Sequence, residues 1–186
     1  MNRTAHIVGT ATTSMQRRDL SAVEMAHQVV DHALADAGLT PDQVDLVVFG
    51  NATAGRLLNQ ACIRGQSFLL DAGLRNAGIV NVDNSCAGGS SALHLATLST
   101  QGGAGTVLAV GVEKMWTGHR METLAGIEDG VPAIDRTFMH ANWENPSGSV
   151  LMALNAKWTV EHMEAWGTTV EQIGRASCRE RVYACV

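Results

Sequence analysis

An apolar run passes directly into a run of small residues at positions 78–93, which read GIVNVDNSCAGGSSAL. Positions 78–84 have the β-branched, apolar character of a strand, and the apolar residues between 90 and 100 recur near helical spacing. The pattern predicts a strand, a sharp turn and a buried helix over 86–101. Gly88 and Gly89 each cost about 1 kcal/mol in a helix interior relative to alanine, and they fit a close backbone approach.

Cys86 lies at the amino end of this predicted helix. Free N–H groups and the macrodipole at a helix start favour a thiolate over a thiol, so this sulfur can act as a nucleophile. The glycines that follow leave room for an acyl carbonyl beside backbone donors, as in a nucleophile elbow. The pattern alone also fits a buried, unreactive cysteine.

Strands and helices alternate over residues 1–112, which we predict to form one α/β unit. Short apolar runs predict strands at 5–12, 45–50, 78–84 and 105–112. A capping box of Ser21 and Glu24 predicts the start of a helix that ends at Gly38, and a second helix is predicted over 60–73. Four strands with helices between them imply a mostly parallel sheet.

Residues 113–173 differ from residues 1–112 in composition and in hydrophobic periodicity. Glycines and prolines punctuate their first part, up to about residue 150, and the periodicity is weak, so we predict an irregular excursion there. Thr168 and Glu171 form a second capping box, which predicts another helix.

The apolar stripe of that last helix disappears in residues 174–186, which hold three arginines, Cys178, Cys185 and the only tyrosine of the chain. We predict that these residues are a non-native tail, as at an adaptor or cloning junction. A genomic read that continues unbroken through Gly174 would contradict this prediction.

Composition and charge exclude several classes of protein. The formal net charge is −5 and the only lysines are Lys114 and Lys157, so no basic run is available to bind nucleic acid. The sequence shows no signal peptide and no apolar stretch long enough for a membrane span, which indicates a cytoplasmic protein. The four cysteines, at positions 62, 86, 178 and 185, show neither metal-ligand pairing nor a disulfide framework.

Residues 81–93, followed by Gly111-Val112-Glu113-Lys114-Met115, resemble the active-cysteine region of the thiolase superfamily. The similarity is greatest to the sterol-carrier-protein-x-like members and the related acetyl-CoA acetyltransferases. The opening segment and residues 158–173 are also similar to that family, so the resemblance covers roughly residues 4–173. It is a resemblance to the amino-terminal half of a thiolase.

The resemblance implies a thiolase-like α/β fold, with one strand–helix half over 1–112 and the start of a loop domain over 113–173. It implies an acyltransferase of lipid or fatty acid metabolism that moves an acyl group between coenzyme A thioesters, by thiolytic cleavage or Claisen condensation. Cys86 is the implied nucleophile, and its backbone N–H is an implied oxyanion donor. Acyl-CoA is the implied substrate, no tightly bound cofactor or metal is expected, and the full-length protein is expected to be a homodimer or homotetramer.

A cysteine nucleophile normally requires a base. His94 lies eight positions after Cys86, about 12 Å along a helix, which is too far to reach the thiol. His119 and His140 reach it only if their segment folds back. The resemblance implies that the activating histidine and a second cysteine belong to the carboxy-terminal half of the family. We therefore expect this chain to be a truncated, inactive fragment.

Two other functions stay open. A condensing enzyme of the ketoacyl synthase type shares the cysteine elbow but takes its acyl group from a carrier protein. A non-catalytic member of the superfamily, acting as a scaffold or partner, keeps the fold without a reactive thiol. The residues 111–115 and 164–172 favour a thiolase, and retention of Cys86 argues against a scaffold.

Overall fold

The computed structural model describes residues 4–14, 19–144 and 148–179. These residues form two compact units, which divide after Thr117. In chain order, the first unit contains α1 (Ala22–Ala37), the short turn η1 (Pro41–Gln43), β1 (Leu46–Gly50), α2 (Ala54–Leu57), α3 (Arg64–Phe68), β2 (Gly78–Val82), the turn η2 (Ser85–Ala87), α4 (Gly88–Gln101) and β3 (Val107–Gly111). The first unit is therefore an α/β domain, as the sequence predicts.

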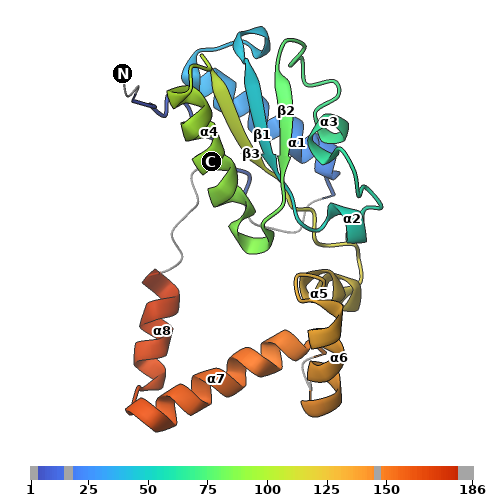
Figure 1. The fold of residues 1–186 in the computed structure, drawn as a ribbon, viewed down its shortest axis with the longest axis vertical. Coiled ribbons are helices and arrows are strands. Elements are labelled where there is room, and N and C mark those ends of the chain that lie inside the picture. Colours follow the sequence, from blue (N-terminus) through green and yellow to red (C-terminus); the bar gives the residue numbers. More distant parts are fainter. Residues whose placement is uncertain (1–3, 15–18, 145–147, 180–186) are drawn as a thin grey trace. The chain divides into compact units, whose positions relative to one another are not determined.

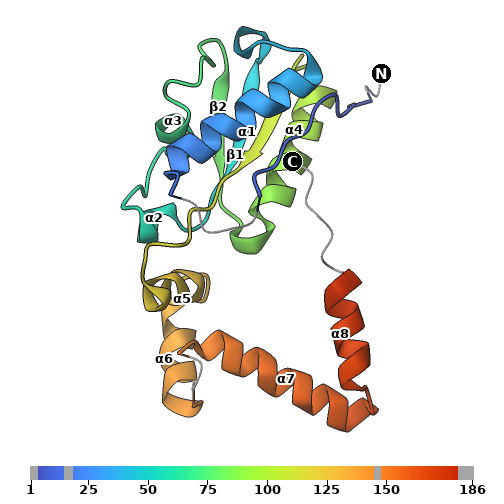
Figure 2. The ribbon, with the colours of Figure 1, turned by 180° about the vertical axis from the view of Figure 1, so that it is seen from behind.

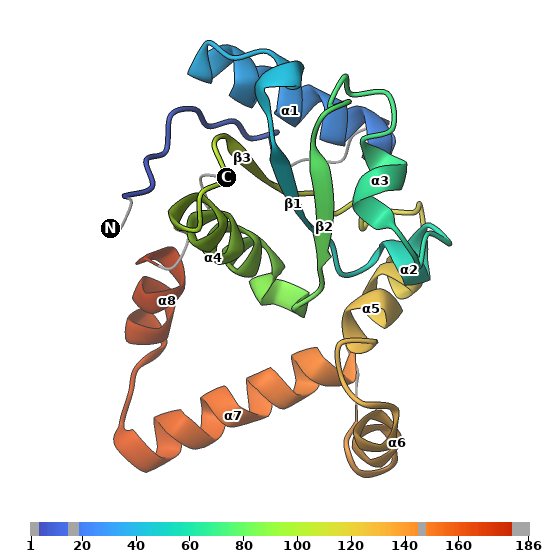
Figure 3. The ribbon, with the colours of Figure 1, turned by 45° about the horizontal axis from the view of Figure 1, so that its top comes forward.

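A three-stranded parallel sheet lies at the centre of the first unit, in the order β2-β1-β3. In register, Val48 of β1 lies between Val80 of β2 and Ala109 of β3. Helices α1 and α4 cover opposite faces of this sheet, so the unit has three layers (Figures 1 and 3). Because all three strands are parallel, their carboxyl ends meet at one edge, and the loops that leave this edge lie close together.

Alternate residues of β1 enter two separate apolar clusters, which explains why this strand is apolar without alternation. Val47 and Phe49 pack with α1 and α3 in the larger cluster. Val48 packs with Ala92 and Ala96 of α4 in the smaller one. The ring of Phe49 meets that of Phe68 edge-on, with 5.6 Å between the centroids. Both faces of the central strand are thus covered by helices.

The capping box predicted for α1 is confirmed. The Ser21 hydroxyl accepts from the Glu24 N–H, and the Glu24 carboxylate accepts from the Ser21 N–H at 2.7 Å. Gly38 ends the helix in the left-handed conformation, with φ of 67°. Local sequence therefore fixes both ends of this helix.

The strand predicted at 5–12 is wrong. Residues 4–14 belong to no strand, and the sheet formed by the described residues consists of β2, β1 and β3. The segment instead runs close to α1: Thr10 N–H donates to the Asp36 carboxylate at 2.8 Å, and a Cβ on Gly9 would lie 2.5 Å from the carbonyl oxygen of Ala33 (Figure 2). Ile7 and Val8 stay exposed. Strand composition alone therefore does not make these residues a strand, because strand formation depends on context more than on intrinsic propensity.

The helix predicted over 60–73 is mostly wrong, because only α3 lies within it and α2 precedes it. Asn59 and Ile63 have positive φ values, of 56° and 44°, which interrupt the helix before Arg64. Gly65 is required inside α3, because a Cβ there would lie 2.8 Å from both Phe49 and Ile79. This close packing holds α3 against the end of the sheet.

The helix predicted over 86–101 is confirmed as η2 and α4, but it is only half-buried. Gly88, Ala92 and Ala96 form its buried face, on the side of the sheet. The sequence pattern did not predict that only one side of the helix is buried, because small residues and leucines are both apolar. Leu93, Leu95 and Leu98 are exposed by 41%, 38% and 48%.

The second unit is helical, so the irregular excursion predicted after residue 113 is wrong. It contains α5 (Arg120–Glu128), α6 (Ala133–Asn142), α7 (Val150–Trp166) and α8 (Val170–Arg179). Some of the residues that indicated irregularity lie at helix boundaries: Gly130 follows α5, and Pro132 directly precedes α6. Gly126 instead lies inside α5 and is buried there.

The second capping box is displaced by one residue from its predicted position. The Thr169 hydroxyl accepts from the Gln172 N–H, and the Gln172 side chain accepts from the Thr169 N–H. Thr168 instead contacts His162. The helix that follows continues to Arg179, and residues 180–186 of the predicted tail lie outside the described residues.

None of the helices in the described ranges has the length and apolar content that a membrane crossing requires.

The Ser21–Glu24 box predicts a pH dependence of stability. Hydrogen bonds from the Ser21 N–H and hydroxyl lower the pKa of Glu24 in the folded chain. The carboxylate therefore stabilises the fold fully above the ordinary glutamate pKa, and this contribution is lost as pH falls through the lower folded-state pKa. We expect E24Q to lose less thermal stability than the parent between about pH 5 and pH 3, measured by circular dichroism. E164Q, on the exposed surface of α7, is the control; equal slopes for parent and E24Q would contradict the prediction.

The exposed leucines of α4 predict poor solubility of the isolated chain. We expect L95Q/L98Q to raise the soluble fraction and to reduce aggregates on size-exclusion chromatography, because both side chains are exposed. A92Q, on the buried face, should unfold the protein. A parent chain that is already a monodisperse, sharply melting monomer would overturn this expectation.

Candidate active site

Cys86 lies in the turn η2, between the carboxyl end of β2 and the amino end of α4. Its side chain is a free, exposed thiol. The strand–turn–helix predicted around it is confirmed, and the alternative of a buried cysteine is wrong. The sulfur is thus accessible at the sheet edge where the strand ends meet. Its role as a nucleophile remains a prediction at this stage.

The turn before Cys86 has a specific geometry. Ser85 has φ of 46°, in the left-handed region that is unfavourable for a residue with a Cβ. The Asn84 side-chain amide donates to the Ser91 hydroxyl at 2.8 Å, and the Asn84 carbonyl accepts from the Ala87 N–H. These bonds connect the turn to the first helical turns of α4 and offset the conformational cost at Ser85.

Small residues bring α4 close to the end of β1. A Cβ on Gly50 would lie 3.1 Å from the carbonyl oxygen of Gly88, so a larger residue at position 50 would force the helix away. The close approach predicted from Gly88 and Gly89 therefore falls between Gly88 and Gly50. Added Cβ atoms on Gly88 and Gly89 would meet no atom within 4 Å, which leaves open space beside the first turn of the helix.

Asn51, which directly follows β1, connects the ends of all three strands. It is 4% exposed. Its N–H donates to the Val82 carbonyl at 3.3 Å, and its side-chain amide donates to the Val112 carbonyl at 2.6 Å. Its side-chain oxygen accepts from the Ala54 N–H at 3.0 Å. A single buried residue, through its backbone and its side chain, thus fixes the relative positions of three loops.

Glu113, in the loop after β3, binds the loop after β1. Its two carboxylate oxygens accept from the N–H groups of Ala52 and Thr53 and from the Thr53 hydroxyl. Hydrogen bonds to an ionised carboxylate are stronger than those between neutral groups. The glutamate within residues 111–115 therefore has a structural role at the edge that contains Cys86.

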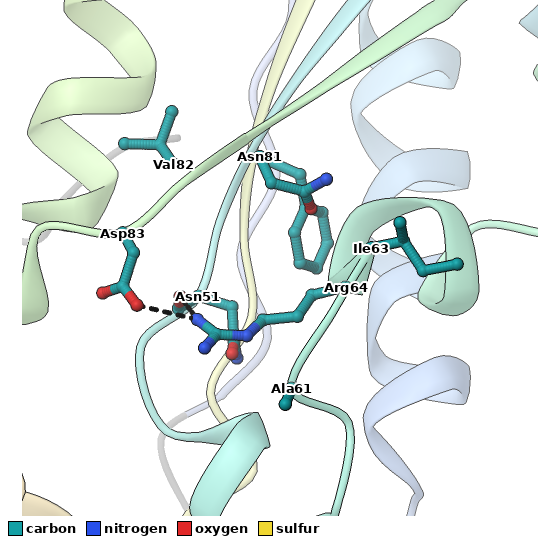
Figure 4. Close-up of a pocket in the computed structure, with 8 residues that line it drawn as sticks. Asn51, Ala61, Ile63, Arg64, Asn81, Val82 and Asp83 are labelled. Carbon is teal, nitrogen blue, oxygen red and sulfur yellow. Dashed lines mark hydrogen bonds and ion pairs between the residues drawn. The ribbon is translucent and has the colours of Figure 1, made fainter.

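A cavity of about 240 Å³ lies at the same edge, lined by Phe49, Asn51, Ala61, Ile63, Arg64, Asn81, Val82 and Asp83. Arg64 crosses it from α3 toward the strand ends (Figure 4). Its Nη1 donates to the Asn51 carbonyl at 2.6 Å and to the Asp83 carboxylate at 3.0 Å. The cavity therefore contains an ion pair between α3 and the loop after β2.

Comparison with known proteins identifies the family to which this chain belongs. The family model described as the thiolase N-terminal domain matches residues 5–176. This chain belongs to the thiolase family. The thiolase resemblance predicted from residues 81–93 and 111–115 is confirmed.

Relatives of this thiolase chain include sterol carrier protein 2 of Gallus gallus, which is 28% identical over 99% of this chain and 33% of that protein. An acetyl-CoA acetyltransferase of Methanothermobacter thermautotrophicus is 30% identical over 94% of this chain and 43% of that protein. The chain thus spans less than half the length of either relative. Among solved structures, the priming β-ketosynthase of the R1128 polyketide pathway has a TM-score of 0.45 and 28% identity, over 53% of this chain and 29% of that chain.

His94 and His140, which were considered as bases for Cys86, have other surroundings in this chain. His94 lies on the exposed surface of α4. His140 Nε2 lies 3.0 Å from the Glu128 carboxylate, whose other oxygen accepts from the Val150 N–H at 2.9 Å. His140 thus takes part in a network that connects α5, α6 and the start of α7. Within the described ranges, no group of three or more histidine, cysteine, aspartate or glutamate residues has a metal-binding arrangement.

Sequence reasoning missed Asn51, Arg64 and Asp83. For Asn51 a signal was available, because it directly follows a predicted strand, and polar residues at the carboxyl ends of parallel strands converge on one edge. Asp83 lies inside the strand predicted at 78–84, which in the structure ends at Val82. Arg64 gave no such signal. Its partners lie 13 and 19 positions away and are brought to it only by the packing of α3.

The buried position of Asn51 predicts a large loss of stability on truncation. We expect N51A to lower the free energy of unfolding by about 2–4 kcal/mol, because the Val112 carbonyl and the Ala54 N–H lose their partners inside the protein. N76A is the control: its exposed amide makes one bond of 3.3 Å to the Asp42 carbonyl, and its effect should stay within about 0.5 kcal/mol. Urea unfolding measures both, and similar losses in the two variants would disprove the role assigned to Asn51.

Proposed function

We propose that the full-length protein is a thiolase-type acyltransferase and that Cys86 is its nucleophile. The observation that supports this most is the exposed thiol of Cys86 at the carboxyl edge of a parallel sheet, in a chain of the thiolase family. Ligands of open α/β sheets bind outside the carboxyl ends of the strands. The thiol therefore lies where a substrate is expected.

The proposed reaction begins with attack of the Cys86 thiolate on the carbonyl carbon of an acyl-CoA, or on the keto carbon of a 3-ketoacyl-CoA. A carbon–sulfur bond forms to Cys86, and the coenzyme A thiolate, or the enolate of acetyl-CoA, leaves and takes up a proton. The backbone N–H of Cys86 donates to the carbonyl oxygen as negative charge develops there. Coenzyme A or a second acyl-CoA carbanion then removes the acyl group.

The open space beside Gly88 and Gly89 supports this role, because the acyl carbonyl must approach the first turn of α4 closely. The resemblance places the activating histidine and the second cysteine in the carboxy-terminal half of the family. We therefore expect this chain alone to complete at most one acylation. By the same resemblance, we propose a homodimer or homotetramer as the full-length form.

The first acylation step can be tested on the chain itself. We expect brief incubation with acetyl-CoA to add one acetyl group to the parent, located at Cys86 by peptide mass spectrometry. C86S should not acquire it, and C62S, which lacks the other described free thiol, should behave as the parent. All three proteins must first show the same circular dichroism spectrum.

The alternatives give different results in this experiment. Acetylation from an acyl-carrier-protein thioester but not from acetyl-CoA would favour a ketoacyl-synthase-type enzyme. Folded parent protein that acquires no acetyl group from either donor, and whose Cys86 is inert to iodoacetamide, would favour the non-catalytic scaffold.

A further inference from the structure

We propose that Arg64 is a positioning residue for Cys86, and that it acts through its ion pair with Asp83. This inference rests on the proposed role of Cys86 as the nucleophile. The cavity at the sheet edge then has a function: it holds the Arg64 guanidinium group, which fixes the position of the turn that carries Cys86.

Arg64 is held in place by its surroundings. It is the first residue of α3, and the next residue, Gly65, packs against Phe49 and Ile79 and donates its N–H to the Asn81 side chain at 2.6 Å. The Arg64 side chain is only 17% exposed, and among the described residues its buried Nε has no hydrogen-bond partner. A guanidinium group removed from water in this way interacts more strongly with the charge it faces than a surface arginine does.

Asp83 is the residue through which Arg64 reaches the turn. It follows β2 directly and precedes Cys86 by three residues, with a half-exposed side chain. The same Nη1 atom that binds Asp83 also binds the Asn51 carbonyl at the end of β1. Arg64 thus connects the start of the reactive turn to the rigid centre of the sheet (Figure 4).

The turn needs such an external connection because its own conformation is unfavourable. Ser85, between Asp83 and Cys86, has a left-handed backbone, which is unfavourable for a residue with a Cβ. Asn84 fixes the turn to α4 on one side through Ser91, and the Asp83–Arg64 pair fixes it to the sheet on the other. Without Arg64 the turn has one connection instead of two, and the sulfur is less well oriented.

The pair also neutralises a charge. Without Arg64, the Asp83 carboxylate would be an uncompensated negative charge three residues from a nucleophile that must itself become negative. Looser orientation and charge repulsion act in the same direction, so loss of Arg64 should slow the reaction of Cys86 with any electrophile. A purely structural role of Arg64 would lower stability without this effect.

The test measures the rate of Cys86 alkylation by iodoacetamide in the full chain, followed by peptide mass spectrometry with N-acetylcysteine as an internal reference. We expect R64A to slow Cys86 by about fivefold or more, within the range of coupling found for contacting residues. R64K should restore part of the rate, because it retains the charge. R75A, which removes another arginine of the same unit from an exposed position, should leave the rate unchanged.

A double-mutant cycle separates positioning from general stability. If Arg64 acts through Asp83, R64A should have little further effect on Cys86 in a D83N background. D83N alone relieves charge repulsion on the thiolate while it loosens the turn, so these two effects oppose each other and D83N serves only as the background of the cycle. If R64A fails to fold, R64K takes its place: it retains the charge but not the guanidinium geometry, and it should react more slowly at Cys86 than the parent.

Two results would overturn the proposal: an unchanged Cys86 rate in folded R64A, or in R64K where R64A does not fold, or equal effects of R64A in the parent and D83N backgrounds. Alkylation needs no acyl donor, so this outcome is independent of the proposed acyltransferase function. If acetyl-CoA fails to acylate the parent while R64A still slows alkylation, the acyl-transfer proposal fails and the positioning role stands.

Discussion

The hydrogen bonds of the buried residue Asn51 fix the loops at the carboxyl edge of the sheet, and the rest of this edge depends on them. Apolar packing brings β1, β2 and β3 together, but it cannot define where the chain goes after each strand, because apolar contacts have no direction. Hydrogen bonds do have direction. The amide of Asn51 makes two of them at once, to Val112 after β3 and from Ala54 in α2, while its main chain binds Val82 at the end of β2.

The charged residues at this edge extend the same network. Glu113 and Arg64 both bind the main chain that follows β1, one from the loop after β3 and the other from α3. Each has its main partners in elements that are distant in sequence. This explains how a short, exposed turn such as Ser85–Ala87 can have a defined position although few of its own atoms are buried. Polar groups at the sheet edge orient the turn, and the apolar layers below supply most of the stability.

The sequence predicted elements whose signals are local and failed where the decisive contact is distant. Ser21, Glu24 and Gly38 specify α1 by themselves, and the strands of the sheet were located to within about two residues. Residues 5–12 have strand composition but run along α1 instead of joining the sheet, which no local pattern reveals. The position of Cys86 was predictable from a strand next to a small-residue run. The Arg64–Asp83 pair was not, because it exists only once α3 packs on the sheet.

The composition of α4 shows how the same residues serve packing and chemistry. Gly88, Ala92 and Ala96 face the sheet, and their small size lets the helix axis approach β1 closely enough for the Gly88 main chain to touch Gly50. A helix with leucines on this face would lie farther from the sheet, and the turn before it would no longer reach the strand ends where Asn51 and Arg64 lie. The small-residue face therefore determines the location of the thiol. Leu93, Leu95 and Leu98 of the same helix stay exposed.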